Sequence, residues 1–177
     1  MLHLLKRRLH FAFTTLFNVE QLKRIFIPLL GLTILLLIIG FNTGFLKVRI
    51  ISKTWLEIIK IAMISLIFPS LSEEIFFRVL FLPHPYENSS TKSQIFWGAI
   101  SLIIFIFYHP LQGMTWNSSG YDVFINPIFL SLAGLLGIVC TISYLATGSI
   151  LLPVIIHWLA VVIWLVMLDG FSKFVLY

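Results

Sequence analysis

The stretch Leu66-Ile-Phe-Pro-Ser-Leu-Ser-Glu73-Glu74-Ile-Phe-Phe-Arg78-Val-Leu-Phe-Leu82 places three charged residues inside an otherwise apolar run. A charge near the middle of a bilayer costs roughly 2.5–3.5 kcal/mol on insertion scales, so these charges must be paired, hydrated or functional. On a helix, Glu74 and Arg78 are neighbours four residues apart, and we expect them to form an ion pair. Glu73 points about 100° away around the helix axis and is left without that partner. A buried carboxylate of this kind is suited to general-base chemistry.

A structural role for the two glutamates is the alternative. Pro69 interrupts the preceding helix, and Ser70-x-x-Glu73 has the spacing of a capping box, with acidic residues at the positive end of a new helix. This alternative does not account for Arg78, which lies a turn further in. Pro83 is expected to end the helix, because proline cannot continue the helical hydrogen bonds.

The composition excludes a water-soluble globule. The 177 residues have room for one domain, and 59% of them are hydrophobic while 11% are charged, against roughly 25% charged in a soluble domain. We therefore expect a multi-pass integral protein of the cell membrane or an internal membrane. Its expected fold is an all-α, polytopic transmembrane bundle of about five to six helices. Because Lys and Arg lie at segment edges, the net charge of +5 favours membrane lipids over nucleic acid as partners.

The chain divides into a basic start and an apolar remainder. Residues 1–24 form a basic N-terminal segment in which Leu9–Leu22 is moderately amphipathic, and we expect an interfacial helix there. Residues 25–177 are expected to form the transmembrane domain. Five basic residues precede the first span, which favours a cytoplasmic N-terminus, but the next loop is basic too. The positive-inside rule therefore places both the N-terminus and the next loop on the cytoplasmic side, and these two assignments conflict.

Hydrophobic runs and turn residues define the expected elements. The expected spans are Ile25–Phe41, Trp55–Leu82 as one long bent helix or two, Ile95–His109, Pro127–Ala146 and Ile150–Leu168. The expected loops include Pro83–Gln94 and Leu111–Asp122. Gly134 and Gly137 favour close approach of helices. At the membrane interface, Glu57 and Lys60 have the spacing for a contact on one helix face.

Two histidines join the charged residues deep in apolar segments. His109 follows Phe105 by one helical turn, so the aromatic ring is placed to fix the imidazole orientation. The alternative for His109 is a histidine favoured by the negative end of its helix. For His157, among bulky apolar residues, the alternative is a core histidine bonded to a backbone carbonyl.

A carboxylate and two histidines that converge in a membrane bundle permit two chemistries. In the first, Glu73 and His109 deprotonate a water that attacks a peptide carbonyl, while His157 donates a hydrogen bond to the developing oxyanion. In the second, the same three residues are ligands of a zinc ion with a water in the fourth position. Helix-borne His-Glu-x-x-His spacing is absent from the sequence.

The sequence favours a metal-independent site without a cofactor. Arg78 lies about one turn from Glu73 and would repel a bound zinc ion. A ligand histidine usually donates its second nitrogen to a carboxylate or carbonyl, and no further acidic residue in the apolar helices is expected to serve His157. The single cysteine, Cys140, excludes a disulfide framework and a cysteine-based metal site, and is expected to be a small packing residue.

These motifs, in this order and in apolar segments, resemble the CPBP family of intramembrane proteases, which includes type II CAAX prenyl endopeptidases and Abi proteins. Glu73-Glu74-x-x-x-Arg78, Phe105-x-x-x-His109 and the later His157 are the matching residues. The resemblance covers about residues 69–166, which we take as the protease-like core.

The resemblance implies a glutamate-dependent endopeptidase that cuts membrane-attached substrates, prenylated CAAX-type proteins among them. In that family's pattern, Glu73 and His109 activate water, His157 assists the oxyanion, and Glu74 and Arg78 support them. One position departs, because Val161 stands where an asparagine often follows the last histidine. The competing hypothesis is therefore a non-catalytic membrane scaffold, immunity or partner-binding protein that keeps the family core.

Overall fold

The computed structural model describes residues 2–175 of the chain. Within them, regular structure is helical apart from an isolated bridge between Arg49 and Leu168. The α-helices are α1 (Leu2–Thr14), α2 (Val19–Asn42), α3 (Trp55–Ser65), α4 (Ser72–Glu74), α5 (Thr91–Thr115), α6 (Tyr121–Phe124), α7 (Pro127–Thr147), α8 (Leu151–Met167) and α9 (Gly170–Val175). Two π-helical segments, η1 (Leu66–Leu71) and η2 (Ile75–Leu80), flank α4, and η3 (Pro85–Glu87) and η4 (Ser118–Gly120) are short 3-10 turns. The expected all-α fold is confirmed.

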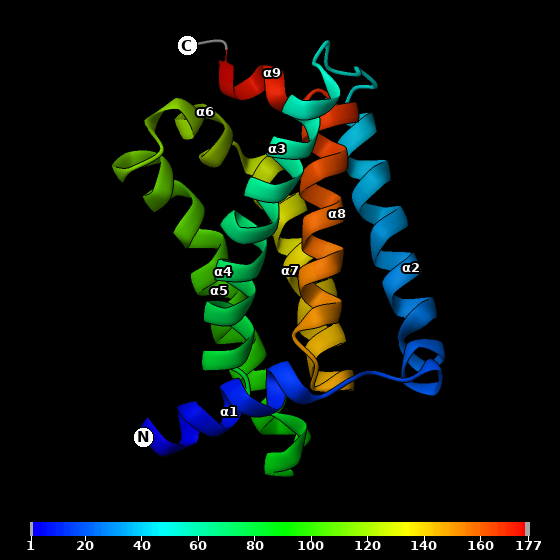
Figure 1. Ribbon diagram of the computed structural model, residues 1–177, viewed down its shortest axis with the longest axis vertical. Coiled ribbons are helices and arrows are strands. Elements are labelled where there is room, and N and C mark those ends of the chain that lie inside the picture. Colours follow the sequence, from blue (N-terminus) through cyan, green and yellow to red (C-terminus); the bar gives the residue numbers. More distant parts are fainter. Residues whose placement is uncertain (1, 176–177) are drawn as a thin grey trace.

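Five helical runs have the character of membrane spans. Four are long and apolar enough to cross a bilayer: α2, the run from α3 to η3, α5 and α7. The fifth, α8, is shorter, with 17 residues, and also apolar. These runs lie side by side along the long axis of the molecule (Figure 1). The protein is therefore a multi-pass integral membrane protein, and the expected number of helices is confirmed.

Helix α7 holds the bundle together, because it packs against α2, α5 and α8. Gly137 is buried on α7, and a Cβ atom at this position would lie 2.8 Å from the Leu102 side chain of α5. The close approach of α5 and α7 therefore depends on this glycine, as its position in the sequence predicted.

The N-terminal segment is not one helix over Leu9–Leu22. Helix α1 ends at Thr14, and Asn18 starts α2 with a capping box. The Asn18 side chain accepts from the Gln21 backbone at 2.9 Å, and the Gln21 side chain accepts from the Asn18 backbone at 2.9 Å. This local cap competes successfully with a continuous amphipathic helix. As a result, α1 crosses the lower end of the bundle instead of extending α2 (Figure 1).

Helix α5 does not stop at His109-Pro110 but continues to Thr115. A proline inside a helix removes one hydrogen bond, and neighbouring helices can compensate for this loss in a membrane protein. The expected loop Leu111–Asp122 therefore contains the last turn of α5, all of η4 and the start of α6.

The expected contact between Glu57 and Lys60 is replaced by another. Glu57 is the third residue of α3, where it forms a capping box with Thr54 and an ion pair with Lys53 at 2.8 Å. A cap satisfies free backbone N–H groups, which the predicted pair would not do.

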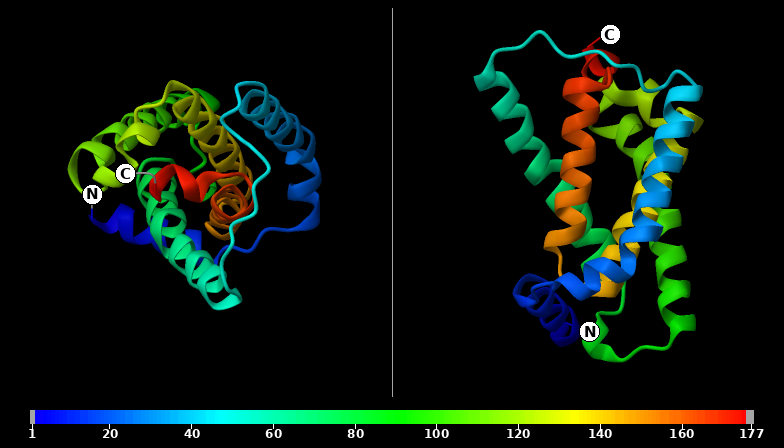
Figure 2. Two further views of the ribbon diagram at one scale, coloured as in Figure 1. Left: turned by 90° about the horizontal axis from the view of Figure 1, so that it is seen from above. Right: turned by 90° about the vertical axis from the view of Figure 1, so that its right-hand side faces the viewer.

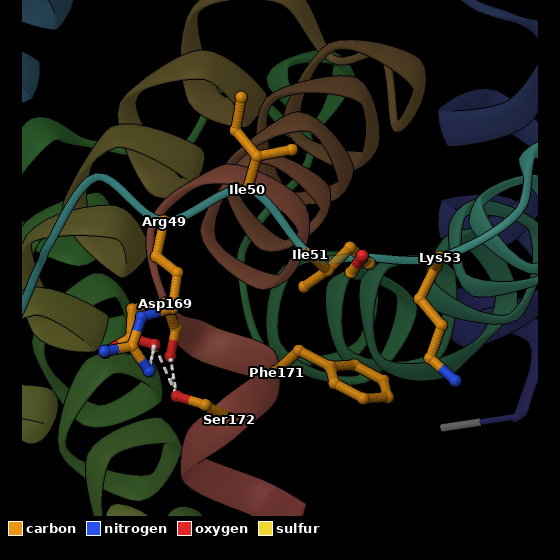
Figure 3. Close-up of a pocket in the computed structure, with 8 residues that line it drawn as sticks. Arg49, Ile50, Ile51, Lys53, Asp169, Phe171 and Ser172 are labelled. Atoms are coloured by element: carbon orange, nitrogen blue, oxygen red, sulfur yellow. Dashed lines mark hydrogen bonds and ion pairs between the residues drawn. The ribbon is translucent and has the colours of Figure 1, made fainter.

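The connection from α2 to α3 is tied to the end of α8. The backbone N–H groups of Arg49 and Ile51 donate to Met167 and Val166, each at 2.9 Å. The Arg49 side chain lies 3.2 Å from the Asp169 carboxylate, and Asp169 is also bonded by the Ser172 hydroxyl (Figure 3). Residues 49–53 of this connection, together with Asp169, Phe171 and Ser172, line a small pocket of about 390 Å³ at the upper end of the molecule.

Candidate active site

The charged stretch lies on a helical run that bends before it reaches the glutamates. Between α3 and η2 the run contains a kink, because Phe68 has non-helical dihedrals (φ −130°, ψ 116°) just before Pro69. Two helices that meet at this kink, one of the two expected forms, are therefore confirmed. The π-helical segment η2, which follows α4, shifts the register locally, as π-helical turns often do at functional sites. Figure 2 shows this run from a second direction, with its upper part leaning away from α8.

Both glutamates are buried, with exposed fractions of 5% for Glu73 and 0% for Glu74. The capping box expected as a structural alternative is not formed. The Ser70 hydroxyl has no hydrogen-bond partner among the described residues, and the start of α4 has no side-chain cap. Helix capping therefore does not explain why Glu73 and Glu74 are buried within this membrane helix.

Glu74 and Arg78 form the predicted ion pair. The Arg78 Nε atom lies 3.0 Å from Glu74 Oε2, and both side chains are fully buried. The guanidinium carbon also lies 5.2 Å from the centre of the Phe105 ring, which is a favourable cation–π distance. Phe105 therefore contacts the cation of this pair in addition to its histidine neighbour.

His157 is bonded to Glu74, at 2.8 Å between Nδ1 and Oε1. Since an ionised carboxylate only accepts hydrogen bonds, Nδ1 is the donor. Two expectations are wrong: His157 is not bonded to a backbone carbonyl, and an acidic residue does serve it. Glu74 and His157 are far apart in the sequence, so no local pattern indicated this bond. The other ring nitrogen, Nε2, is 3.9 Å from Glu73 Oε2, too far for a direct hydrogen bond.

His109 is held by the backbone of its own helix. Its Nδ1 atom lies 2.8 Å from the Phe105 carbonyl oxygen, which can only accept, so Nδ1 donates. In the neutral ring this leaves Nε2 with a free lone pair. The Phe105 ring meets the imidazole edge-on, with centroids 4.8 Å apart. The alternative of a helix-terminal histidine is wrong, because α5 extends to Thr115.

Glu73, His109 and His157 line one cavity of about 1240 Å³. This volume exceeds the roughly 300–1,000 Å³ of common small-molecule sites. Val161 also lines the cavity and brings no polar group. Polar side chains that the sequence reading missed contribute to the wall: Ser65, Ser72, Tyr108, Gln112 and Asn117. Two of these residues, Tyr108 and Gln112, lie on α5. Their position could have indicated them, because Tyr108 directly precedes His109 and Gln112 follows it by about one turn.

Glu73 is the one of the two glutamates that is left uncommitted. Its Oε2 atom is buried and has no hydrogen-bond partner among the described residues. Glu74, by contrast, is used by both Arg78 and His157. A carboxylate with a free oxygen in the wall of a cavity is able to accept a proton from a water or a substrate.

The structure also groups three side chains with metal-ligating atoms. Among the described residues, ligand atoms of Glu74, Cys140 and His157 lie within 4.8 Å of one another. No pattern in the sequence indicated that Cys140 lies beside Glu74 and His157, because the three residues belong to different helices. This group differs from the zinc alternative of Glu73, His109 and His157. The Arg78 cation, 3.0 Å from the shared carboxylate, would repel a divalent metal ion there.

Comparison with known proteins gives one match. A family model described as type II CAAX prenyl endopeptidase Rce1-like matches residues 54–163, which is more than half of the chain. The matched range includes all six candidate site residues. No curated protein and no solved structure matches the chain.

Proposed function

Because this chain belongs to the Rce1-like family of type II CAAX prenyl endopeptidases, we propose that it hydrolyses membrane-attached peptides with water activated by Glu73 and His109. At the family level the chain is a CAAX-type intramembrane protease. The glutamate-dependent mechanism and a membrane-attached, prenylated or otherwise lipid-bound substrate are the proposed refinements. One observation supports the mechanism most directly: Glu73 is buried, uncommitted and lines the same cavity as both histidines.

In the first step, a water donates one hydrogen bond to Glu73 and one to the free Nε2 of His109. The water oxygen attacks the carbonyl carbon of the scissile peptide bond, and its proton passes to the Glu73 carboxylate. The carbonyl π electrons move to the oxygen, which becomes an oxyanion. In the second step the carbon–nitrogen bond breaks, and the leaving amine takes the proton back from Glu73. The products are a carboxylic acid and an amine.

His157 is assigned to the oxyanion. Its Nδ1 atom donates to Glu74, so Nε2 is able to donate as well only when the ring is an imidazolium. In that form the imidazolium and the Arg78 guanidinium face the two carboxylates of Glu73 and Glu74. A positioned donor of this kind contributes on the order of 10²–10³ in rate.

Metal independence is part of the proposal. The bond between Glu74 and His157 directs the imidazole without an ion. Arg78 supplies the positive charge beside Glu74 that a metal would otherwise supply.

The test uses purified protein in liposomes with a membrane-tethered fluorescent peptide. Glu73→Gln is expected to abolish cleavage, because the amide cannot accept the water proton. Glu57→Gln is the matched control, since it removes a carboxylate from the same helical run at an exposed position. Equal cleavage by Glu73→Gln and the unaltered protein would exclude Glu73 as the base.

A second candidate function follows from Val161, which lines the cavity and offers no amide donor one helical turn after His157. Under this candidate the protein is a non-catalytic scaffold, or an immunity or partner-binding protein. Glu73→Gln would then preserve the cellular phenotype at normal protein level. A phenotype lost with Glu73→Gln, at unchanged protein level, favours the protease.

A further inference from the structure

Helix α1 is bonded to two of the three helical runs that contain the candidate catalytic groups. Arg8 Nη1 donates to the carbonyl of Leu80, the last residue of η2, at 3.0 Å. The backbone N–H of Ile150, directly before α8, donates to the carbonyl of Ala12 at 2.9 Å. The glutamates precede η2 and the oxyanion histidine lies on α8, so α1 joins the ends of the two elements whose spacing sets the site.

The contact through Arg8 has a fixed direction. Its Nε and Nη2 atoms donate to the two oxygens of Glu87 at 2.7 and 2.8 Å, with exposed fractions of 12% and 18% for the two side chains. Glu87 Oε1 also accepts from the His84 backbone N–H at 2.7 Å. A guanidinium that binds both carboxylate oxygens is held in one orientation, unlike a lysine ammonium. The third Arg8 bond is therefore aimed at Leu80.

Helix α1 depends on its surroundings to stay docked. It has 13 residues, and isolated helices shorter than ~12–15 residues are marginal in water. On its inward face only Ala12 is fully buried, while Leu5, Arg8, Leu9 and Phe11 are partly buried. Contacts on the outward face therefore influence how much of the time α1 is docked.

The outward face of α1 is basic and lacks a carboxylate partner. Lys6 and Arg7 are exposed and form no ion pair within residues 2–175, although Arg7 lies over the Tyr86 ring at 4.9 Å. The acidic residues at this end, Glu20 and Glu87, are each already paired with another cation. The exposed positive charge is therefore available to an anionic partner outside the chain.

Exposed apolar side chains beside the basic face of α1 indicate that its partner is a lipid surface. Leu2 and Phe13 on α1 are 67% and 47% exposed. Figure 1 shows α1 across the bundle, at the end where the spanning helix α2 begins. The end of a spanning helix is expected at the level of the lipid headgroups. Basic residues beside exposed apolar ones are typical of helices that lie in a membrane interface. A soluble acidic protein or a nucleic acid would leave the apolar flank in water.

We propose that α1 is a clamp controlled by anionic phospholipids: Lys6 and Arg7 bind their headgroups, and Arg8 and Ala12 then hold together the helices of the candidate site. Each basic residue near an anionic surface strengthens binding about fivefold. Anionic lipid therefore stabilises docked α1 and, through it, the geometry of the Glu74–His157 bond.

The test compares protein in phosphatidylcholine vesicles with protein in vesicles of equal parts phosphatidylcholine and phosphatidylglycerol. Amide hydrogen exchange of α1 is measured in both, and this measurement does not depend on the proposed function. Phosphatidylglycerol is expected to slow exchange in α1. The Lys6→Gln/Arg7→Gln variant removes two cations, each of which contributes about fivefold to binding. The slowing caused by phosphatidylglycerol is therefore expected to be about 25-fold smaller in this variant. Lys47→Gln/Lys60→Gln is the matched control, with exposed cations near the opposite end.

A second measurement tests the connection to the site, and it rests on the proposed function. With the unaltered protein, phosphatidylglycerol is expected to raise kcat for the tethered peptide at nearly constant KM. Arg8→Gln is expected to remove this rise while Lys6 and Arg7 still bind the lipid. A double exchange of charges, Arg8→Glu with Glu87→Arg, is not expected to restore it, because a carboxylate at position 8 cannot donate to the Leu80 carbonyl.

Three results would overturn the proposal. Equal α1 exchange in both vesicle types excludes the lipid surface, and an equal effect of the control variant excludes Lys6 and Arg7 as its contacts. Slowed exchange with an unchanged kcat excludes the clamp. Absence of cleavage under every condition instead contradicts the proposed function, and the exchange measurement then still decides whether α1 binds anionic lipid.

Discussion

Replacement of Arg78 by methionine is expected to destabilise the protein by about 3–5 kcal/mol, the typical cost of removing one partner from a buried ion pair. Arg78 and Glu74 have no exposed side-chain surface, and their charged atoms are 3.0 Å apart. Methionine fills much of the volume but leaves the Glu74 carboxylate without its guanidinium. The remaining partner, His157, is a single hydrogen bond at 2.8 Å.

The magnitude corresponds to a change of about 10²–10⁴ in the ratio of folded to unfolded protein. Two matched variants separate this effect from general damage. Lys53→Met breaks a pair with the same spacing at the start of the same helical run, where Lys53 directly precedes the N-cap of α3. This pair is exposed, with side-chain fractions of 35% and 46%. Its expected cost is about 0–1 kcal/mol.

The second matched variant is Glu74→Gln/Arg78→Met, which removes both charges. It is expected to recover most of the lost stability, because a buried pair can be replaced by neutral groups at little cost. Cleavage is not expected to recover. The introduced amide would still accept a hydrogen bond from His157, but the carboxylate that the imidazolium faces would be lost.

The measurement is unfolding of the purified protein in mixed micelles with increasing sodium dodecyl sulfate, followed by tryptophan fluorescence. A single variant Arg78→Met as stable as the unaltered protein would refute the reasoning. So would a double variant less stable than either single one, because the two charges would then not compensate each other.

Three further outcomes are expected. Val161→Asn is expected to raise kcat by up to about 10²-fold by adding an oxyanion donor, and a fall in kcat at saturating substrate would contradict this. Gly148→Ala is expected to lower the free energy of unfolding by roughly 1–3 kcal/mol, because the glycine has φ +70° and an added Cβ would lie 2.9 Å from His84 Nε2. Gly31→Ala is the control in the same detergent titration, because an added Cβ there has no atom within 4 Å. Chelator treatment is expected to leave cleavage unchanged, as is Cys140→Ser; loss of cleavage that added zinc restores would contradict metal independence.

The sequence alone determined the membrane spans and the local pairing on the charged helix. Hydropathy over some 20 residues reports whether a segment tolerates lipid, and the spacing of Glu74 and Arg78 is fixed by helix geometry. The polar residues in apolar segments were therefore visible before any fold was known. Their likeness to one protease family was visible for the same reason.

Only the tertiary structure decided which partner each group has. The bond from His157 to Glu74 joins residues 83 positions apart, and no local pattern distinguishes it from a backbone contact. The continuation of α5 past Pro110 and the docking of α1 through Arg8 also depend on neighbouring helices. Hydrogen bonds between distant segments form only where packing brings a buried donor and a buried acceptor together, and this is why Glu73, alone of the two glutamates, is left uncommitted.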